Sequence, residues 1–222
     1  MPTAVITGAS RGLGLAVARA LTGEGWQLVL DARDGELLRR NAPGGAVLVP
    51  GDVSNPDHRL ALRDAVGPQL DLLVNNASHL GPSPQPLLRD YPLEELRRVY
   101  EVDVLAPLAL TQALLPLLLS GGTVVNISSD AAVEAYEGWG GYGSAKAALD
   151  HLSAVLAQEN PGVRVLSFDP GDMRTDMHQA AFPGEDITDR PLPETVVPAF
   201  LRLLDRPSGR YRASDLLPVE LP

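Results

Sequence analysis

The chain has 222 residues, 45% of them hydrophobic, a size that fits one α/β domain with a substantial core. Its formal net charge of −10 at pH 7 disfavours binding to nucleic acid or anionic membranes, and the absence of cysteine excludes disulfides and thiolate chemistry. We expect no secretory leader before the first strand-like run, and hence a cytoplasmic location.

Short aliphatic or β-branched runs alternate with helix-length segments along the chain. The predicted strands are residues 4–7, 27–30, 46–49, 71–75, 123–128 and 163–168. Several are apolar on both faces, as parallel strands covered by helices are, and the segments between them are long enough for crossover helices. The most apolar segment, residues 104–119, is too short to span a membrane and predicts a buried helix. The pattern predicts an α/β fold with a doubly wound parallel sheet.

A glycine-rich turn follows the first predicted strand. Residues 7–14 read Thr-Gly-Ala-Ser-Arg-Gly-Leu-Gly and lead into a helix-forming segment, residues 15–21. Glycines let the backbone approach a pyrophosphate closely, and the free N–H groups at a helix start attract its charge. The turn therefore predicts a dinucleotide over Gly12 and Gly14, although a tight strand-to-helix turn without a ligand has the same composition.

A second signal comes from a tyrosine and a lysine four residues apart. Tyr142 and Lys146 open a segment with helical apolar spacing, so they share one helix face, and Lys146 is the single lysine among eighteen basic residues. A nearby ammonium favours the phenolate, so we expect a lowered Tyr142 pKa and an acid/base pair. Ser129 lies just beyond the predicted strand 123–128, where ligands of open α/β sheets bind. The alternative interpretation is a solvated helix face.

Five motifs, in this order and spacing, resemble the short-chain dehydrogenase/reductase family. They are the turn at residues 7–14, Asn75-Asn76-Ala77, Ser129, Tyr142 with Lys146, and Pro170-Gly171 with Thr175. The resemblance implies a Rossmann-like sheet of about seven strands in the order 3-2-1-4-5-6-7, with helices on both faces. It also implies one dinucleotide-binding and catalytic domain over residues 1–222, with a substrate loop at about residues 176–192, and a homodimer or homotetramer.

The resemblance further implies an oxidoreductase that transfers a hydride between a nicotinamide cofactor and a small carbonyl or alcohol substrate, without a metal. Ser129 would hold the substrate oxygen, Tyr142 would exchange its proton, and Lys146 would bind the nicotinamide ribose and tune Tyr142. The implied cofactor contacts are Gly8, Ser10, Arg11, Gly12, Leu13, Gly14, Arg33, Asp52, Val53, Asn75, Ala77, Pro170, Gly171, Met173 and Thr175. The alternative function is a catalytically silent NADP(H)-binding sensor or regulatory protein.

Two residues depart from the family pattern. Asp103 occupies the position of an asparagine that anchors a water near the lysine, and Ser78 replaces a glycine. Asp103 is either a fourth catalytic member or a structural residue. An ionised Asp103 facing Lys146 would favour the charged lysine while partly cancelling its effect on Tyr142. At Ser78 we expect a small backbone adjustment.

The end of the second predicted strand favours NADP(H) over NAD(H). Ala32 aligns with the position of the acid that binds the ribose hydroxyl, Arg33 aligns with a phosphate-binding arginine, and Arg11 offers a second cation. A shift of one residue in the alignment would instead make Asp31 the ribose ligand. In another interpretation Arg33 is an exposed loop charge paired with Asp34.

The substrate cleft is predicted from the loop before Tyr142 and from the loop after Thr175. Tyr136, Trp139 and Met177 would suit an apolar or aromatic carbonyl compound, although the aromatic residues equally fit packing against their own loop. His79, His151 and His178 have no acidic or sulfur partner at metal-ligand spacing, so we expect surface residues and no metal site.

Overall fold

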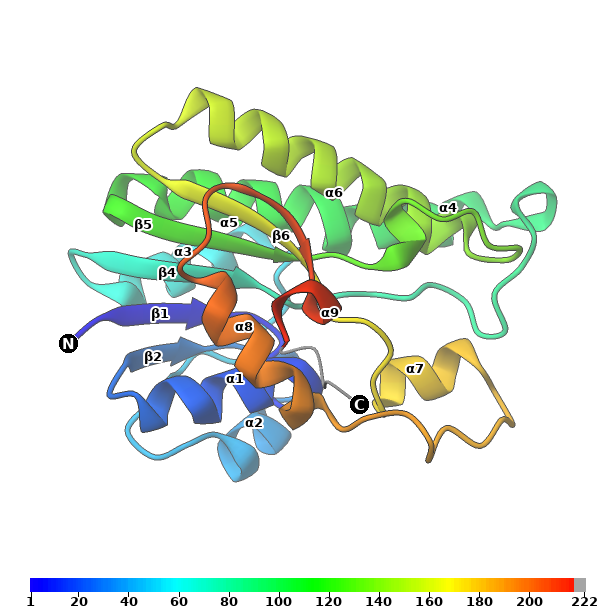
Figure 1. Ribbon diagram of the computed structural model, residues 1–222, viewed down its shortest axis with the longest axis horizontal. Coiled ribbons are helices and arrows are strands. Elements are labelled where there is room, and N and C mark those ends of the chain that lie inside the picture. The colour runs from blue at the N-terminus through cyan, green and yellow to red at the C-terminus, as the bar shows by residue number, and fades with distance from the viewer. Residues whose placement is uncertain (218–222) are drawn as a thin grey trace.

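The computed structural model describes residues 1–217, apart from the side chains of residues 119 and 120. Its centre is a sheet of seven parallel strands in the order β3-β2-β1-β4-β5-β6-β7 (Figure 1). The predicted fold class and strand order are confirmed. The strands are β1 (Thr3–Ile6), β2 (Gln27–Leu30), β3 (Val47–Leu48), β4 (Leu70–Asn75), β5 (Leu118–Ile127), β6 (Arg164–Asp169) and β7 (Gly209–Arg212).

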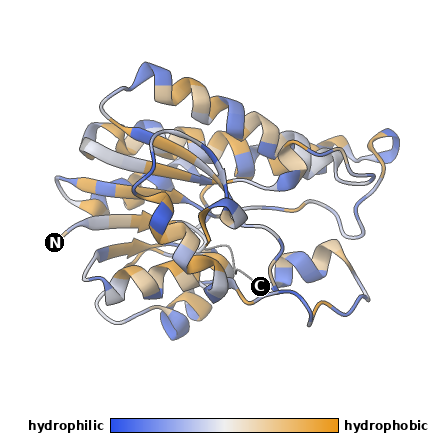
Figure 2. Ribbon diagram, viewed as in Figure 1, coloured by the Kyte–Doolittle hydropathy of each residue, from blue (hydrophilic) through white to orange (hydrophobic). Residues whose placement is uncertain are grey.

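Helices cover both faces of the sheet because successive strand residues point to opposite sides. In β1, Ala4 and Ile6 pack in a core with α1 and α8, whereas Val5 packs in the core beneath α3 and α5. Bands of hydrophobic and hydrophilic residues alternate along α6 (Figure 2). The helices are α1 (Gly12–Gly23), α2 (Gly35–Asn41), α3 (Pro56–Val66), α4 (Leu93–Tyr100), α5 (Ala106–Leu114), α6 (Gly140–Glu159), α7 (Asp176–Ala181), α8 (Val197–Leu203) and α9 (Ala213–Leu216).

The predicted helix over residues 104–119 is divided in the structure. A π-helical turn over Glu101–Leu105 precedes α5, a 3-10 turn over Leu115–Leu117 follows it, and β5 begins at Leu118. Pro116 within that turn lacks an amide hydrogen and disfavours further α-helix, which frees the last leucines for the sheet. Among residues 1–217, no helix combines the length and apolarity needed to cross a bilayer.

Helix starts place the functional loops at the carboxyl ends of the strands. Asn55 caps α3 by accepting a hydrogen bond from the Asp57 amide, and Pro56 lies in the first turn, where no amide hydrogen is needed. Helix α1 begins at Gly12, three residues before the predicted start, because the Leu15 amide donates to the Arg11 carbonyl and closes the first helical turn there. The turn and the first turn of α1 therefore form one continuous unit.

Candidate active site

A cleft of about 1010 Å³ lies at the carboxyl ends of the strands. One end is formed by the glycine turn, the end of β2 and residues 51–53. The other end is formed by the end of β5, the start of α6 and the end of β6, and residues 170–178 line the cleft from there to the glycine turn, where Asp176 contacts Arg11. This edge of a doubly wound sheet is where such folds bind ligands, so the cleft is the first candidate for the site.

The glycine turn is shaped to receive an anion. Gly8 and Gly12 have φ angles of +66° and +57°, and a Cβ atom on Gly14 would lie 2.6 Å from the Gly8 carbonyl oxygen. The start of α1 has neither a side-chain cap nor an acidic residue in its first turn, so its free N–H groups face the cleft without a competing carboxylate. These features fit the pyrophosphate of a dinucleotide.

Asp31, the alternative ribose ligand, is already engaged. Its Oδ1 atom accepts a hydrogen bond from the Gly8 amide at 2.8 Å, its Oδ2 atom lies 2.9 Å from His58 Nε2, and the residue is 1% exposed. Burial raises the pKa of Asp31, while the His58 and Gly8 hydrogen bonds oppose that rise. The carboxyl group holds the glycine turn against β2 and α3.

The two predicted phosphate-binding arginines are exposed. Arg33 lines the cleft and forms no ion pair within the described part of the chain, and Asp34 accepts a hydrogen bond from the Leu37 amide at the start of α2. Arg11 Nη1 lies 2.6 Å from Asp176 Oδ2 on α7. Asp34 therefore acts as a helix cap, and Arg11 connects the glycine turn to the predicted substrate loop.

Ser129, Tyr142 and Lys146 line the same end of the cleft. Ser129 Oγ donates to Asp130 Oδ1 at 3.0 Å and accepts a hydrogen bond from the Ala131 amide at 3.2 Å. Lys146 is 2% exposed, donates to the Ile127 carbonyl at 2.9 Å, and places Nζ 5.4 Å from the centroid of the Tyr142 ring. The alternative of a solvated helix face is thus wrong, because both α6 residues are buried.

The start of α6 packs closely against the turn that follows Ser129. A Cβ atom on Gly143 would lie 2.5 Å from the Ala131 carbonyl oxygen, so a glycine next to Tyr142 permits this approach. Tyr142 itself packs with Leu80 and Ala131 in a small core cluster. The serine from β5 and the tyrosine from α6 are therefore held on adjoining, tightly packed segments.

The direction of the Tyr142 pKa shift differs from the expectation. Burial raises the pKa of the Tyr142 phenol above its usual value, and the Asp103 carboxyl acts in the same direction. The expected lowering considered the ammonium alone and left out the loss of water around a residue that is 8% exposed. In this state of the protein the phenol keeps its proton.

Asp103 is fully buried near the lysine. Its Oδ1 atom accepts a hydrogen bond from the His79 amide at 2.8 Å, and its Oδ2 atom is buried without a partner among residues 1–217. Burial raises the pKa of Asp103, and the Lys146 charge opposes the rise. The Ser78 hydroxyl is also buried without a partner in that part of the chain. Ser78 needs no left-handed backbone, since positive φ angles among the described residues occur only at glycines.

Asn75 is placed differently from the expectation, and its neighbour takes the position at the cleft. Asn75 Nδ2 donates to Asn126 Oδ1 at 2.7 Å, inside a buried network that continues to Ser153. Asn76 lines the cleft, and its Nδ2 donates to the Thr7 carbonyl at 2.9 Å. Alternation along the strand explains the difference, because consecutive side chains point to opposite sides.

The remaining predicted contacts divide between the cleft and its rim. Trp139 and Met177 line the cleft, whereas Tyr136 is 47% exposed, lies outside the lining and donates to Asp130 Oδ2 at the rim. Thr175 lines the cleft and also caps α7 through the His178 amide. The other predicted cofactor contacts at the lining are Ser10, Leu13, Asp52, Val53, Ala77, Pro170, Gly171 and Met173.

Two histidines are less exposed than expected. His178 is 9% exposed, lines the cleft and stacks on Phe182 with ring centroids 4.8 Å apart, and His79 is half-buried beside Asp103. The expectation of a surface position is correct only for His151. His178 is buried on α7, and the irregular loop that leads into this helix has no strong sequence pattern. The burial could therefore not be predicted from the sequence.

Comparisons with known proteins agree with this geometry. A model of the short chain dehydrogenase family matches residues 2–186. Sepiapterin reductase of Rattus norvegicus is 38% identical over 199 residues, covering 80% of this chain and 76% of that protein. The uncharacterized oxidoreductase YciK of Escherichia coli (strain K12) is 34% identical over 221 residues, covering 93% of this chain and 87% of that protein.

Solved structures are similar to this chain over nearly the whole fold. A short chain dehydrogenase from Shigella flexneri 2a, complexed with NADP, has a TM-score of 0.88 at 29% identity, covering 96% of this chain and 97% of that one. The fold, the geometry of the site and the sequence similarity all indicate the same protein family. The chain belongs to the short-chain dehydrogenase/reductase family of oxidoreductases.

Proposed function

We propose that this protein is an NADP(H)-dependent reductase of small carbonyl compounds, with the reverse oxidation of the alcohol at the same site. The observation that carries the proposal is the placement of Ser129, Tyr142 and Lys146 at one end of a cleft whose other end is the glycine turn. A nucleotide sensor would need the turn, but it would have no use for the serine. The combination therefore supports catalysis over sensing.

The chemistry divides between the cofactor and three side chains. The cleft residues would hold a nicotinamide cofactor, which would supply the hydride for the carbonyl carbon. Ser129 exchanges its acceptor, Asp130 Oδ1, for the substrate oxygen and stabilises the negative charge that develops there. Tyr142 gives its phenolic proton to that oxygen, so the carbonyl becomes an alcohol and the phenol becomes a phenolate. The Lys146 ammonium stabilises this phenolate.

The protonation state of Tyr142 suits reduction. Because burial raises the pKa of the phenol, Tyr142 holds its proton at neutral pH and has it available for the substrate oxygen. Asp103, which the family pattern left open as a fourth catalytic member, acts in this proposal as a positioning residue through Lys146. Its buried carboxyl holds the segment of His79 and contributes to the charge balance around the ammonium.

Three features support NADP(H) over NAD(H). Both oxygens of the Asp31 carboxyl are engaged, one with the Gly8 amide and the other with His58, in holding the glycine turn. Arg33 is exposed at the cleft, and Arg11 lies in the glycine turn. A guanidinium binds phosphate in a bidentate manner, so these arginines suit the extra phosphate of NADP(H). The Shigella structure with NADP is consistent with this choice.

The substrate end of the cleft favours a carbonyl attached to a flat, apolar group. Trp139 lies 5.9 Å from both the Tyr142 and Phe182 rings, centroid to centroid, and Met177 lines the same end. Such aromatic walls bind planar groups by stacking and edge contacts. In this proposal residues 1–222 act as one dinucleotide-binding and catalytic unit, and the loop at about residues 176–192 covers the substrate.

We also infer association into a homodimer or homotetramer. Leu93, Leu105 and Val155 are exposed on the α4–α5 region and on α6, where family members pair. Light scattering of the purified protein distinguishes these assemblies from a monomer.

Spectrophotometric assays of cofactor oxidation test the proposal. The purified protein is assayed with NADPH or NADH against sepiapterin, aromatic ketones and aromatic diketones, and Tyr142→Phe serves as the matched inactive variant. We expect turnover with NADPH, and a fall in kcat of about 10²–10⁴-fold in Tyr142→Phe with unchanged NADPH binding. Tight NADPH binding by the wild type without turnover across the panel would instead identify a sensor.

A further inference from the structure

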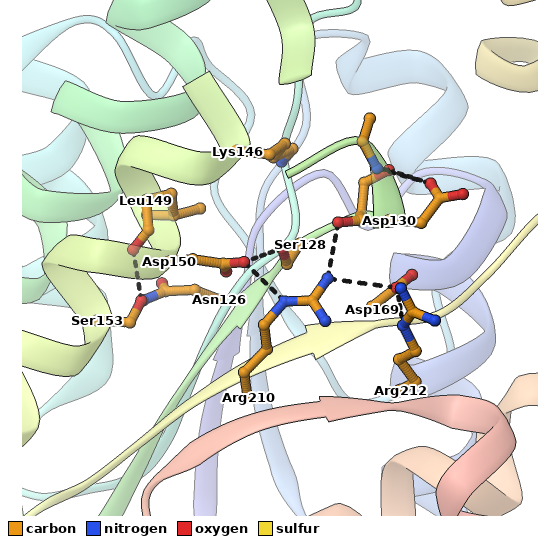
Figure 3. Close-up of polar contacts among 12 residues, drawn as sticks. Asn126, Ser128, Asp130, Lys146, Leu149, Asp150, Ser153, Asp169, Arg210 and Arg212 are labelled. Carbon is orange, nitrogen blue, oxygen red and sulfur yellow. Dashed lines mark hydrogen bonds and ion pairs between the residues drawn. The ribbon is translucent and has the colours of Figure 1, made fainter. Parts of the chain in front are cut away.

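An arginine on the last strand of the sheet contacts the main-chain carbonyl of Ser129, the proposed catalytic serine. Arg210, on β7, directs its guanidinium toward the ends of the neighbouring elements (Figure 3). Its Nη2 atom donates to the Ser129 carbonyl at 2.9 Å and lies 3.4 Å from Asp169 Oδ2. Its Nε atom donates to Asp150 Oδ2 at 2.9 Å. One side chain thus joins three segments that are far apart in the sequence.

Each of these segments carries part of the proposed machinery. Asp150 follows Tyr142 and Lys146 at intervals of four residues on α6, so the three share one helix face. Asp169 ends β6 directly before Pro170 and Gly171, two of the predicted cofactor contacts. Arg210 is therefore placed to fix the serine of β5 relative to the acid/base helix.

The contact between β5 and α6 is reinforced beside the serine. Ser128 Oγ donates to Asp150 Oδ2 at 2.8 Å, the same oxygen that accepts from Arg210. Asp150 and Asp169 side chains are only 13% and 4% exposed, and that of Arg210 is 26% exposed. Charge-assisted hydrogen bonds at this burial are stronger than surface ion pairs, and a planar guanidinium serves several acceptors at once.

We propose that Arg210 is a positioning residue for the reaction, which it serves by holding the Ser129 peptide in register with Tyr142 and Lys146. The inference rests on the proposed function, because it assigns the arginine a role in turnover. Arg210 holds the carbonyl of the peptide that carries the serine side chain, and rotation of this peptide would move the hydroxyl away from the substrate oxygen. Small displacements of a catalytic group reduce rates strongly, even when substrate still binds.

Arg212 provides a matched control. It lies two residues farther along β7, has Nε 3.5 Å from the same Asp169 oxygen, and is 42% exposed. Its other ion-pair partner is Glu134, at 3.8 Å, and within residues 1–217 it has no hydrogen bond to the Ser129 carbonyl or to Asp150. Replacement of Arg212 therefore removes a similar charge but keeps the hydrogen bond between Arg210 and the Ser129 carbonyl.

The first experiment compares Arg210→Met, Arg210→Lys and Arg212→Met with the wild type in NADPH-dependent reduction of the best carbonyl substrate. We expect kcat to fall about 10–100-fold in Arg210→Met, with KM and NADPH affinity within about threefold of the wild type. Arg210→Lys should recover part of kcat, because one ammonium cannot serve all the acceptors. Arg212→Met should stay within about twofold.

A second comparison separates positioning from stability. Arg210→Met leaves Asp150 buried without its charged partner, which lowers stability, so Arg210→Met/Asp150→Asn is made to neutralise that carboxylate. We expect this double variant to regain thermal stability without regaining kcat. Recovery of kcat together with Tm would overturn the proposal, as would an equal loss of kcat in Arg212→Met.

A double-mutant cycle with the serine completes the test. If Arg210 acts through Ser129, Arg210→Met adds less than about threefold to the loss already present in Ser129→Ala. Losses that multiply fully would overturn the positioning role while leaving the proposed function intact. A wild-type enzyme that binds NADPH but reduces no carbonyl would overturn both.

Discussion

The two ends of the cleft are built in opposite ways. At the catalytic end, Tyr142 and Lys146 are 8% and 2% exposed and packed against the end of β5. At the ribose end, Arg11 and its partner Asp176 have side chains that are 61% and 73% exposed. The proposed chemistry thus depends on buried groups with fixed neighbours, whereas the proposed cofactor choice depends on charges in water.

This contrast predicts different responses to mutation and to salt. When a buried hydrogen-bonding group is removed, water cannot take its place. Its loss therefore lowers activity or stability strongly, and the size of this effect hardly changes with ionic strength. Exposed charges are screened, so their contributions are smaller and fall as salt is added. Variants at the two ends of the cleft should therefore differ in the size of their effects and in their dependence on salt.

Of the variants compared below, Ser129→Ala should have the largest effect. The variant loses the hydroxyl proposed to stabilise the developing negative charge, and kcat should fall about 10²–10³-fold in steady-state assays. Ser144→Ala, on the outer side of α6, is the control and should keep wild-type kcat. Similar activity in both variants would remove Ser129 from the mechanism.

Gly14→Ala should disturb the cofactor end at a tightly packed point of the glycine turn. The added Cβ would lie 2.6 Å from both Asn76 Nδ2 and the Gly8 carbonyl oxygen, so the turn must shift. We expect a loss of about 1–3 kcal/mol in unfolding free energy and weaker NADPH binding, measured by denaturation and fluorescence titration. Gly23→Ala in the same helix has nothing within 4 Å and should be neutral or slightly stabilising. Equal effects of the two alanines would contradict the close packing.

Arg33→Asp tests the exposed charge at the ribose end. The ratio of kcat/KM for NADPH to that for NADH should fall about tenfold or invert, and the change should shrink at high salt. Arg40 is exposed like Arg33, but it lies on α2 and outside the cleft lining. Arg40→Asp should therefore leave the ratio unchanged. Equal rates with both cofactors before and after the Arg33 change would refute the NADP(H) preference.

Asp103→Asn should produce the smallest effect, a gain in stability that depends on pH. Burial raises the folded-state pKa of Asp103 above 3.8, its ordinary value, so ionisation destabilises the folded wild type as pH rises through that range. The variant has no such charge and should melt at a higher temperature at pH 7. Well below pH 3.8, the wild-type carboxyl is protonated in both the folded and the unfolded state, and the two melting curves should converge. A lower Tm for the variant at pH 7 would mean that the ionised carboxylate stabilises the fold.

Much of the fold and part of the site could be predicted from the amino-acid sequence. The alternation of apolar runs predicted the parallel sheet, because buried strands need helices on both faces. The glycine turn and the Tyr142–Lys146 spacing placed two parts of the cleft, since both patterns are local. The errors at Asn75, Tyr136 and His178 concern which way a side chain points, which depends on neighbours distant in sequence.

By itself, the sequence determined the order of strands and helices, the turn that faces an anion, and the helix face that carries the tyrosine and the lysine. The assembled fold was needed to show that Asp31 is engaged by His58, that burial raises the pKa of Tyr142, and that Arg210 contacts the Ser129 carbonyl. The two kinds of feature depend on residues at different separations along the sequence. Turns and helix faces follow from residues a few positions apart, whereas burial and charge pairing depend on segments that meet only when the sheet is assembled.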